Sequence, residues 1–117
     1  MYRREFQKTS NIVRALCQFY LLNGCPETNI TVLPFEAYSK IKISGKVEIS
    51  ESILEEVVGW LNQPKTSEVE YYYDDLLASA LEDNELSLLG LMIDYADISY
   101  QEGVLEISIS RTFESTD

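Results

Sequence analysis

The chain has 117 residues and a formal charge of −11, because it holds 9 lysines and arginines against 20 aspartates and glutamates. Apolar residues make up 45% of the chain, which excludes a disordered acidic tail and allows one domain with a core. The chain contains no histidine, so we expect no imidazole base, no Ser-His or Cys-His nucleophile pair and no His-ligated zinc. The net negative charge argues against a nucleic-acid partner.

Two cysteines, Cys17 and Cys25, are too few for a disulfide framework in a chain of this size. Cys17 falls within the apolar stripe of a predicted helix, which favours a core role over a redox or metal role. Residues 1–10 lack the continuous apolar stretch of a signal peptide, and no apolar run approaches the roughly 20 residues that span a bilayer. We therefore expect a cytoplasmic protein without a membrane partner.

The first predicted element is an amphipathic helix from Glu5 to about Leu22. Its apolar stripe consists of Phe6, Val13, Leu16, Cys17 and Tyr20, and its polar side consists of Lys8, Asn11, Arg14 and Gln18. The pair Asn23-Gly24 should end the helix, since both residues tolerate the left-handed conformation that closes helices.

A change of periodicity after this helix predicts two strands. Ile30 and Val32 indicate the first strand, and Pro34 should end it because proline donates no ladder hydrogen bond. Residues 40–43 alternate Lys-Ile-Lys-Ile, as in a half-buried strand. The tripeptide Ser44-Gly45-Lys46 then predicts a turn or a bulge.

The middle of the chain predicts three helices. Ser52 and Glu55 have the spacing of a capping box, and Pro64 should close the helix that they begin or the loop after it. The apolar face of that helix would be Ile53, Leu54, Val57, Val58 and Leu61. Residues 67–80 repeat the capping signature before a regular apolar stripe, and residues 86–96 are apolar nearly all round, which is typical of a buried helix.

The last predicted elements form a hairpin about Glu102-Gly103, with residues 98–100 and 105–109 as its strands. The order is therefore αββαααββ. We predict an α+β two-layer sandwich, in which one sheet of four or five strands carries its helices on one face. A single domain would cover residues 1–113, followed by a frayed acidic tail at residues 114–117.

Charge and exposed aromatic residues suggest where a partner would bind. Residues 66–117 hold 13 acidic residues and one basic residue, Arg111, an asymmetry that can steer a basic partner. The plainer interpretation is a solvated acidic surface. Aromatic residues with little rotamer freedom favour interfaces, so the candidate interface residues are Trp60, Tyr71, Asp74 and Asp75. A cation site at Asp74, Asp75, Glu82, Asp83 and Glu85 is a weaker alternative, because no EF-hand spacing accompanies them.

The five glycines are scattered and form neither a Walker A loop nor a dinucleotide fingerprint. Taken in order, however, the segments SNIVRALCQFYLLNG, NITVLPFEAYSKIKISG, residues 51–85 and LSLLGLMIDYADISYQEGVLEISISR resemble a reduced GHKL (Bergerat-fold) ATPase domain. The small anti-sigma-factor kinases are the most similar branch. The resemblance implies that Asn11 matches the Mg²⁺-binding Asn, and that Gly45 and Gly90 remain from the nucleotide-binding glycines. The family's adenine-binding Asp is replaced here by the tripeptide Ser44-Gly45-Lys46.

The missing Asp implies a pseudo-enzyme that has lost nucleotide binding. We therefore predict a non-catalytic regulatory or protein-interaction domain in a bacterial signalling circuit. It would use no cofactor and bind another protein, which could carry a basic face, and homo-oligomerisation is left open. The alternative is an active ATP-dependent anti-sigma-type serine kinase that binds Mg-ATP through Asn11, Gly45 and Gly90.

Overall fold

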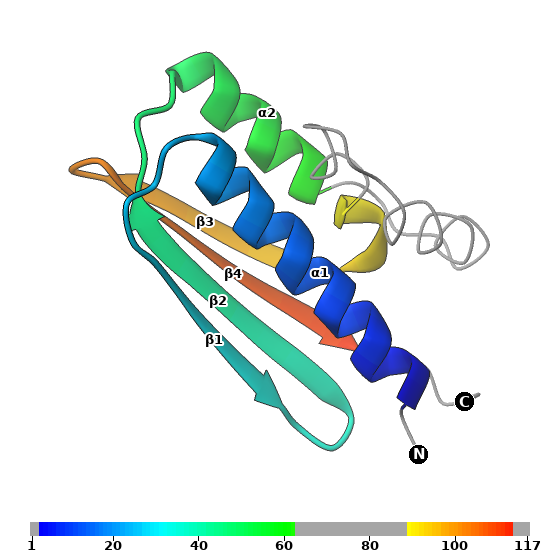
Figure 1. The fold of residues 1–117 in the computed structure, drawn as a ribbon. Helices are drawn as coiled ribbons and strands as arrows, with labels where there is room; N and C mark the ends of the chain where they lie inside the picture. Colours follow the sequence, from blue (N-terminus) through cyan, green and yellow to red (C-terminus); the bar gives the residue numbers. More distant parts are fainter. Residues whose placement is uncertain (1–2, 63–88, 114–117) are drawn as a thin grey trace.

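The computed structural model describes residues 3–62 and 89–113, in which two helices lie on one face of a four-stranded antiparallel sheet (Figure 1). In chain order the elements are α1 (Arg3–Leu22), β1 (Thr28–Pro34), β2 (Tyr38–Lys46), α2 (Glu51–Leu61), the short 3₁₀ helix η1 (Gly90–Met92), β3 (Tyr95–Gln101) and β4 (Val104–Thr112). This arrangement confirms the predicted α+β class and the four-stranded sheet with helices on one face. The predicted helix at residues 67–80 lies outside the described residues. No helix among those described is long and apolar enough to cross a bilayer.

The strand order is β1-β2-β4-β3, so β2 and β4 form the centre of the sheet and β1 and β3 its edges. Alternate residues of the central strands point toward the helices, as the sequence predicts. These inward residues include Ile41 and Ile43 of β2 and Leu105, Ile107 and Ile109 of β4, all of them buried. The predicted end of the first strand at Pro34 and the predicted hairpin turn at Glu102-Gly103 are also confirmed; both turn residues have positive φ.

The rotation of α1 about its own axis differs from the prediction. Ile12, Leu16 and Phe19 are buried, whereas Phe6 is 47% exposed and Cys17 is only half-buried. The helix has apolar residues on two sides, and the predicted stripe mixed them. The end of the helix agrees with the sequence analysis: Gly24 adopts φ +77°, and the Cys25 N–H donates to the Tyr20 carbonyl at 3.1 Å.

The strand β2 continues through Ser44-Gly45-Lys46, so the predicted turn or bulge there is wrong. Gly45 pairs with Thr28 on one side and Leu105 on the other. A Cβ at Gly45 would collide with the Cys25 Sγ and lie 2.9 Å from the Glu27 carbonyl oxygen. Glycine is therefore used at this position for a close approach between segments, and not to turn the chain.

The N-cap of α2 is Ser50, so the predicted capping residue Ser52 is wrong. The Ser50 side chain accepts a hydrogen bond from the Ile53 N–H at 3.1 Å, and its carbonyl accepts from the Leu54 N–H at 3.0 Å. Val57 and Leu61 are the buried residues of α2, whereas Ile53 and Val58 of the predicted apolar face are exposed.

The segment predicted as a helix over residues 86–96 leaves helical geometry after Met92. Ile93 is extended and β3 begins at Tyr95. Backbone pairing with the sheet competes successfully with the helix, since the Asp94 N–H donates to the Ser110 carbonyl at 2.9 Å. Leu89 is fully buried, so the prediction that this segment contributes to the core is confirmed.

Two glycines provide a matched test of this packing. A Cβ at Gly90 would collide with the Trp60 carbonyl at the end of α2, whereas a Cβ at Gly59 would meet no atom within 4 Å. We expect Gly90→Ala to lower the free energy of unfolding by about 1–3 kcal/mol through overpacking. Gly59→Ala should raise it by about 0.5–1 kcal/mol, because alanine is the better helix former. Urea unfolding of both variants measures the difference, and equal stabilities would contradict the packing of α2 against η1.

Candidate functional site

The three residues that the GHKL resemblance assigns to nucleotide binding lie on different elements. Asn11 is a half-buried residue of α1, Gly45 belongs to β2, and Gly90 begins η1. The space beside each glycine is filled by protein atoms, from Cys25 at Gly45 and from the Trp60 backbone at Gly90. None of the three residues lines any of the three hollows described below. A nucleotide site built on them stays a prediction.

The predicted interface residues have different placements. Trp60 is half-buried and packs against the core, where it lines a hollow of about 240 Å³ between α1 and α2. Tyr71, Asp74 and Asp75 lie outside the described residues, as do the other acidic residues of the alternative cation site. Residues 3–62 and 89–113 contain no group of three or more His, Cys, Asp or Glu residues placed to hold a metal ion.

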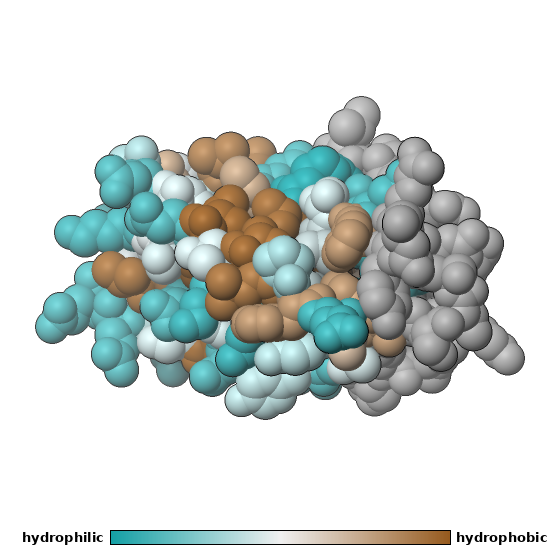
Figure 2. Space-filling model, turned by 90° about the horizontal axis from the view of Figure 1, so that it is seen from below, coloured by the Kyte–Doolittle hydropathy of each residue, from teal (hydrophilic) through white to brown (hydrophobic). Residues whose placement is uncertain are grey.

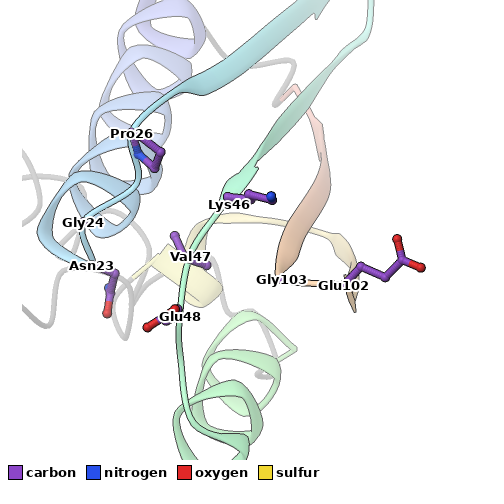
Figure 3. A pocket seen from close by; sticks show the side chains of 8 residues that line it. All are labelled: Asn23, Gly24, Pro26, Lys46, Val47, Glu48, Glu102 and Gly103. Carbon is purple, nitrogen blue, oxygen red and sulfur yellow. The ribbon is translucent and has the colours of Figure 1, made fainter.

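A hollow of about 480 Å³ with both polar and apolar lining lies at one end of the sheet (Figure 3). It is lined by Asn23, Gly24, Pro26, Lys46, Val47, Glu48, Glu102 and Gly103. The charged ends of Glu48 and Glu102 point in different directions in Figure 3. Among the described residues, this hollow therefore shows no convergent set of charged groups of the kind that catalysis requires.

A buried ion pair joins the two ends of the fold. Arg111 is fully buried and makes a two-pronged contact with the Glu5 carboxylate, with Nε–Oε1 at 2.8 Å and Nη2–Oε2 at 3.1 Å. Its Nη1 donates to the Met92 carbonyl, and the Lys8 ammonium lies 3.7 Å from the same carboxylate. The prediction that Lys8 lies on the polar side of α1 is wrong, because Lys8 is 3% exposed. Because Glu5, Lys8 and Arg111 are all buried, a ligand cannot reach this cluster, and its role is structural.

Sequence reasoning missed this ion pair, although the strand period contained a signal. Leu105, Ile107 and Ile109 alternate inward, and Arg111 is the next residue of that series. A charged residue in an inward position predicts a buried partner of opposite charge. Glu5 is one of 20 acidic residues in the chain, and nothing in the sequence places the start of the first helix beside the end of the last strand, so the sequence alone does not identify the partner as Glu5.

The cost of separating this pair can be measured. Arg111→Met leaves the Glu5 carboxylate buried without its main partner, and we expect it to lower the free energy of unfolding by about 3–5 kcal/mol. The double variant Glu5→Leu/Arg111→Met removes both charges and should lose less than the single variant. Urea unfolding compares them, and a double variant at least as unstable as Arg111→Met would contradict the pairing.

The phenol of Tyr20 has a displaced pKa. Burial raises the pKa of the phenol far above its usual value, and electrostatic interactions with Cys25 and Glu106 add to the effect. The hydroxyl donates to the Leu105 carbonyl of β4 at 2.7 Å and lies 3.4 Å from the Ile43 carbonyl of β2. A neutral, fully buried phenol bound to two strands anchors α1 to the sheet and is no candidate nucleophile.

The outer edge of β1 presents backbone groups that no described residue pairs. Phe35 N–H donates to the Tyr38 carbonyl at 2.9 Å, which fixes the alternation of the β1–β2 ladder. Asn29, Thr31 and Leu33 therefore direct their backbone groups toward β2. The remaining strand residues, which are Thr28, Ile30, Val32 and Pro34, direct theirs away from the sheet. The backbone of Pro34 faces away from β2, so its missing N–H costs no hydrogen bond of the β1–β2 ladder.

An apolar groove of about 410 Å³ runs beside this edge. It is lined by Ser10, Val13, Arg14, Cys17, Gln18 and Leu21 of α1 and by Ile30 of β1. Figure 2, seen from the side of the β1–β2 hairpin, shows hydrophobic side chains gathered within a largely hydrophilic surface. Ile30 and Val32 are 37% and 39% exposed although they point toward the helix side of the sheet. The helix α1 thus leaves half of this strand uncovered. The unpaired edge of β1 and the groove together are called the β1 surface below.

Comparisons with known proteins add no relative: no family model matches the chain, and no curated protein matches it. The GHKL-like resemblance therefore has neither support nor contradiction from relatives.

The filled glycine positions generate a prediction about nucleotides. Because Cys25 and the Trp60 backbone occupy the space beside Gly45 and Gly90, we expect millimolar Mg-ATP or Mg-ADP to leave the melting temperature unchanged. A ligand that binds only the folded state at a hundredfold excess over its Kd would add about 2.7 kcal/mol of stability. Differential scanning fluorimetry with Mg²⁺ alone as the control measures the shift. An upward shift that Asn11→Ala abolishes would support the kinase alternative instead.

Proposed function

We propose that this chain is a non-catalytic regulatory domain of the cytoplasm that binds another protein by strand addition at the β1 surface. The observation that carries the proposal is the unpaired outer edge of β1 beside an apolar groove. In strand addition the backbone hydrogen bonds supply affinity, and side chains that alternate into a groove supply specificity. The β1 surface offers both parts of such a site.

The composition of β1 supports this use. Proteins protect edge strands from unwanted pairing with lysines, prolines, inward charges, bulges or short length. The seven residues of β1 carry no charge, and among these devices only a proline is present, at the last position. In a chain with a net charge of −11, a neutral and apolar edge strand is an exception that binding would explain.

The side chains around β1 indicate the chemistry of the added strand. Its inward residues would enter the groove between Val13, Cys17 and Leu21 and should be apolar. Its residues on the open face would lie two strand positions from Lys40 and Lys42, the neighbours of Leu33 and Thr31 across the ladder, so uncharged or acidic residues would fit there better than basic ones. Loss of nucleotide binding and of catalysis remains part of the proposal.

A pair of variants with equal exposure tests the proposal. Val32 and Leu33 are both 39% exposed, but Val32 points toward the helix side of the sheet and Leu33 toward its open face. In the free domain a lysine at either position can hold its ammonium in water, so both variants should fold. An added strand would bury the ammonium at position 32 only.

We expect tagged wild-type protein and Leu33→Lys to retain the same partner from a low-salt lysate of the source cell or from a mixture with untagged copies of this chain. Val32→Lys should retain it at least tenfold less. Quantitative mass spectrometry of the eluates gives the ratios, and circular dichroism melts check that both variants are folded. A partner retained equally by all three proteins, or none retained by any, would overturn the proposal.

A further inference from the structure

The β1 surface has a symmetry that identifies one partner, and this inference rests on the proposed function. We propose that two copies of this chain pair through their β1 strands in antiparallel orientation. The twofold axis that relates them would stand perpendicular to the sheet and pass midway between the Thr31 residues of the two copies. The two four-stranded sheets would then form one continuous sheet. Both helix layers would lie on the same face of it, because such an axis does not exchange the faces.

The order of residues in β1 fits this axis. When Thr31 stands opposite Thr31 of the second copy, Ile30 of each copy stands opposite Val32 of the other. Apolar residues therefore meet on the helix side of the sheet. Ile30 and Val32 are the residues whose N–H and C=O groups face outward, so each Ile30–Val32 pair can make two hydrogen bonds. At each end, the Thr28 N–H can donate to the Pro34 carbonyl, and the missing N–H of Pro34 leaves only one ladder bond unmade.

Charge favours the same surface. Two copies that each carry a charge of −11 repel one another, and they can approach most closely through a segment without charge. The strand β1 has no charged residue, and in this register its flanking Glu27 and Glu36 stand opposite Phe35 and Pro26 of the second copy. The lysines of the two β2 strands would be three strand spacings apart, about 14 Å, beyond the Debye length at physiological salt.

The helix layer provides an independent geometric argument. The helix α1 packs on β1 and β2 and α2 packs on β3, so each helix covers about half of the sheet (Figure 1). With α1 above the β1–β2 pair, the two α1 helices of the dimer would be about two strand spacings apart, near 10 Å. Helices pack at about 8–10 Å, so the second α1 would close the groove that the first leaves open.

The helix residues that would meet include an apolar stripe flanked by Ser10, Arg14 and Gln18. The stripe on the groove side of α1 consists of Val13, Cys17 and Leu21 at helical spacing, with Phe6 two turns before Val13. Val13 also packs against the core, whereas Leu21 is 60% exposed and Phe6 is 47% exposed in the single chain. A second copy would remove from water both this stripe and the exposed halves of Ile30 and Val32.

A cysteine placed on the axis is the first test. In this register Thr31 and its counterpart form a non-hydrogen-bonded pair with Cα atoms about 4.5 Å apart, which is within the range of a disulfide. We expect Thr31→Cys to give more than half disulfide-linked dimer on a non-reducing gel after mild oxidation. Asn29→Cys is the matched control, since it lies on the same face of β1 but its two copies would be about 14 Å apart. The wild type reports on Cys17 and Cys25. Thr31→Cys that links no better than Asn29→Cys would overturn the register.

The oligomeric state is the second test. Sedimentation of purified wild-type protein and of Leu33→Lys should give about twice the 13.4 kDa mass of one chain, and Val32→Lys should give a folded monomer. A wild type that stays monomeric at all concentrations, with no link through Thr31→Cys, would overturn this inference. If the wild type then retains a different protein from a lysate and Val32→Lys does not, the proposed function stands without the dimer. If Val32→Lys retains that protein as well as the wild type does, both proposals fail.

Discussion

The buried contact between Glu5 and Arg111 is the constraint on which the rest of the structure depends. It joins the first turns of α1 to the end of β4, 106 residues apart. Dehydrating two charges is costly, and the cost is offset only because the guanidinium also reaches the Met92 carbonyl and the carboxylate also meets Lys8. An ion pair with such strict geometry fixes the rotation of the helix on the sheet.

That rotation determines which apolar stripe of α1 enters the core. With Glu5 held inward, Thr9, Ile12 and Leu16 follow it at helical spacing and are buried. At the far end, Tyr20 reaches the carbonyl oxygens of β2 and β4, in the space that Gly45 leaves beside Cys25. The second stripe of α1 is therefore turned toward β1, which the helix only half covers. The groove is a consequence of contacts made elsewhere in the fold.

The sequence predicts the regular parts of this fold well, because their signals are local. The alternation of residues 40–43 and 105–109, the turn at Glu102-Gly103 and the end of β1 at Pro34 each follow from the conformational limits of the residues involved. The rotation of α1 could not be predicted, since a helix with two apolar sides has two acceptable solutions and a distant arginine selects between them. Ser50 and Ser52 are both good N-caps, and only the path of the chain from β2 selects Ser50. The β1 surface was missed for the same reason, because it depends on what α1 leaves uncovered.

The two edges of the sheet are not equivalent, and this difference is the strongest reason to regard β1 as a pairing edge. The other edge strand, β3, carries the exposed Asp97 near its centre, and a charge there disfavours the addition of an apolar strand. The strand β1 has no such residue and exposes Ile30 and Val32 beside an apolar groove. The same chain thus protects one edge by charge and leaves the other neutral. The edge of β1 exposes both unpaired backbone groups and half-covered apolar side chains to water. Pairing with a complementary strand would hydrogen-bond the backbone groups and remove the apolar surface from water in the same step.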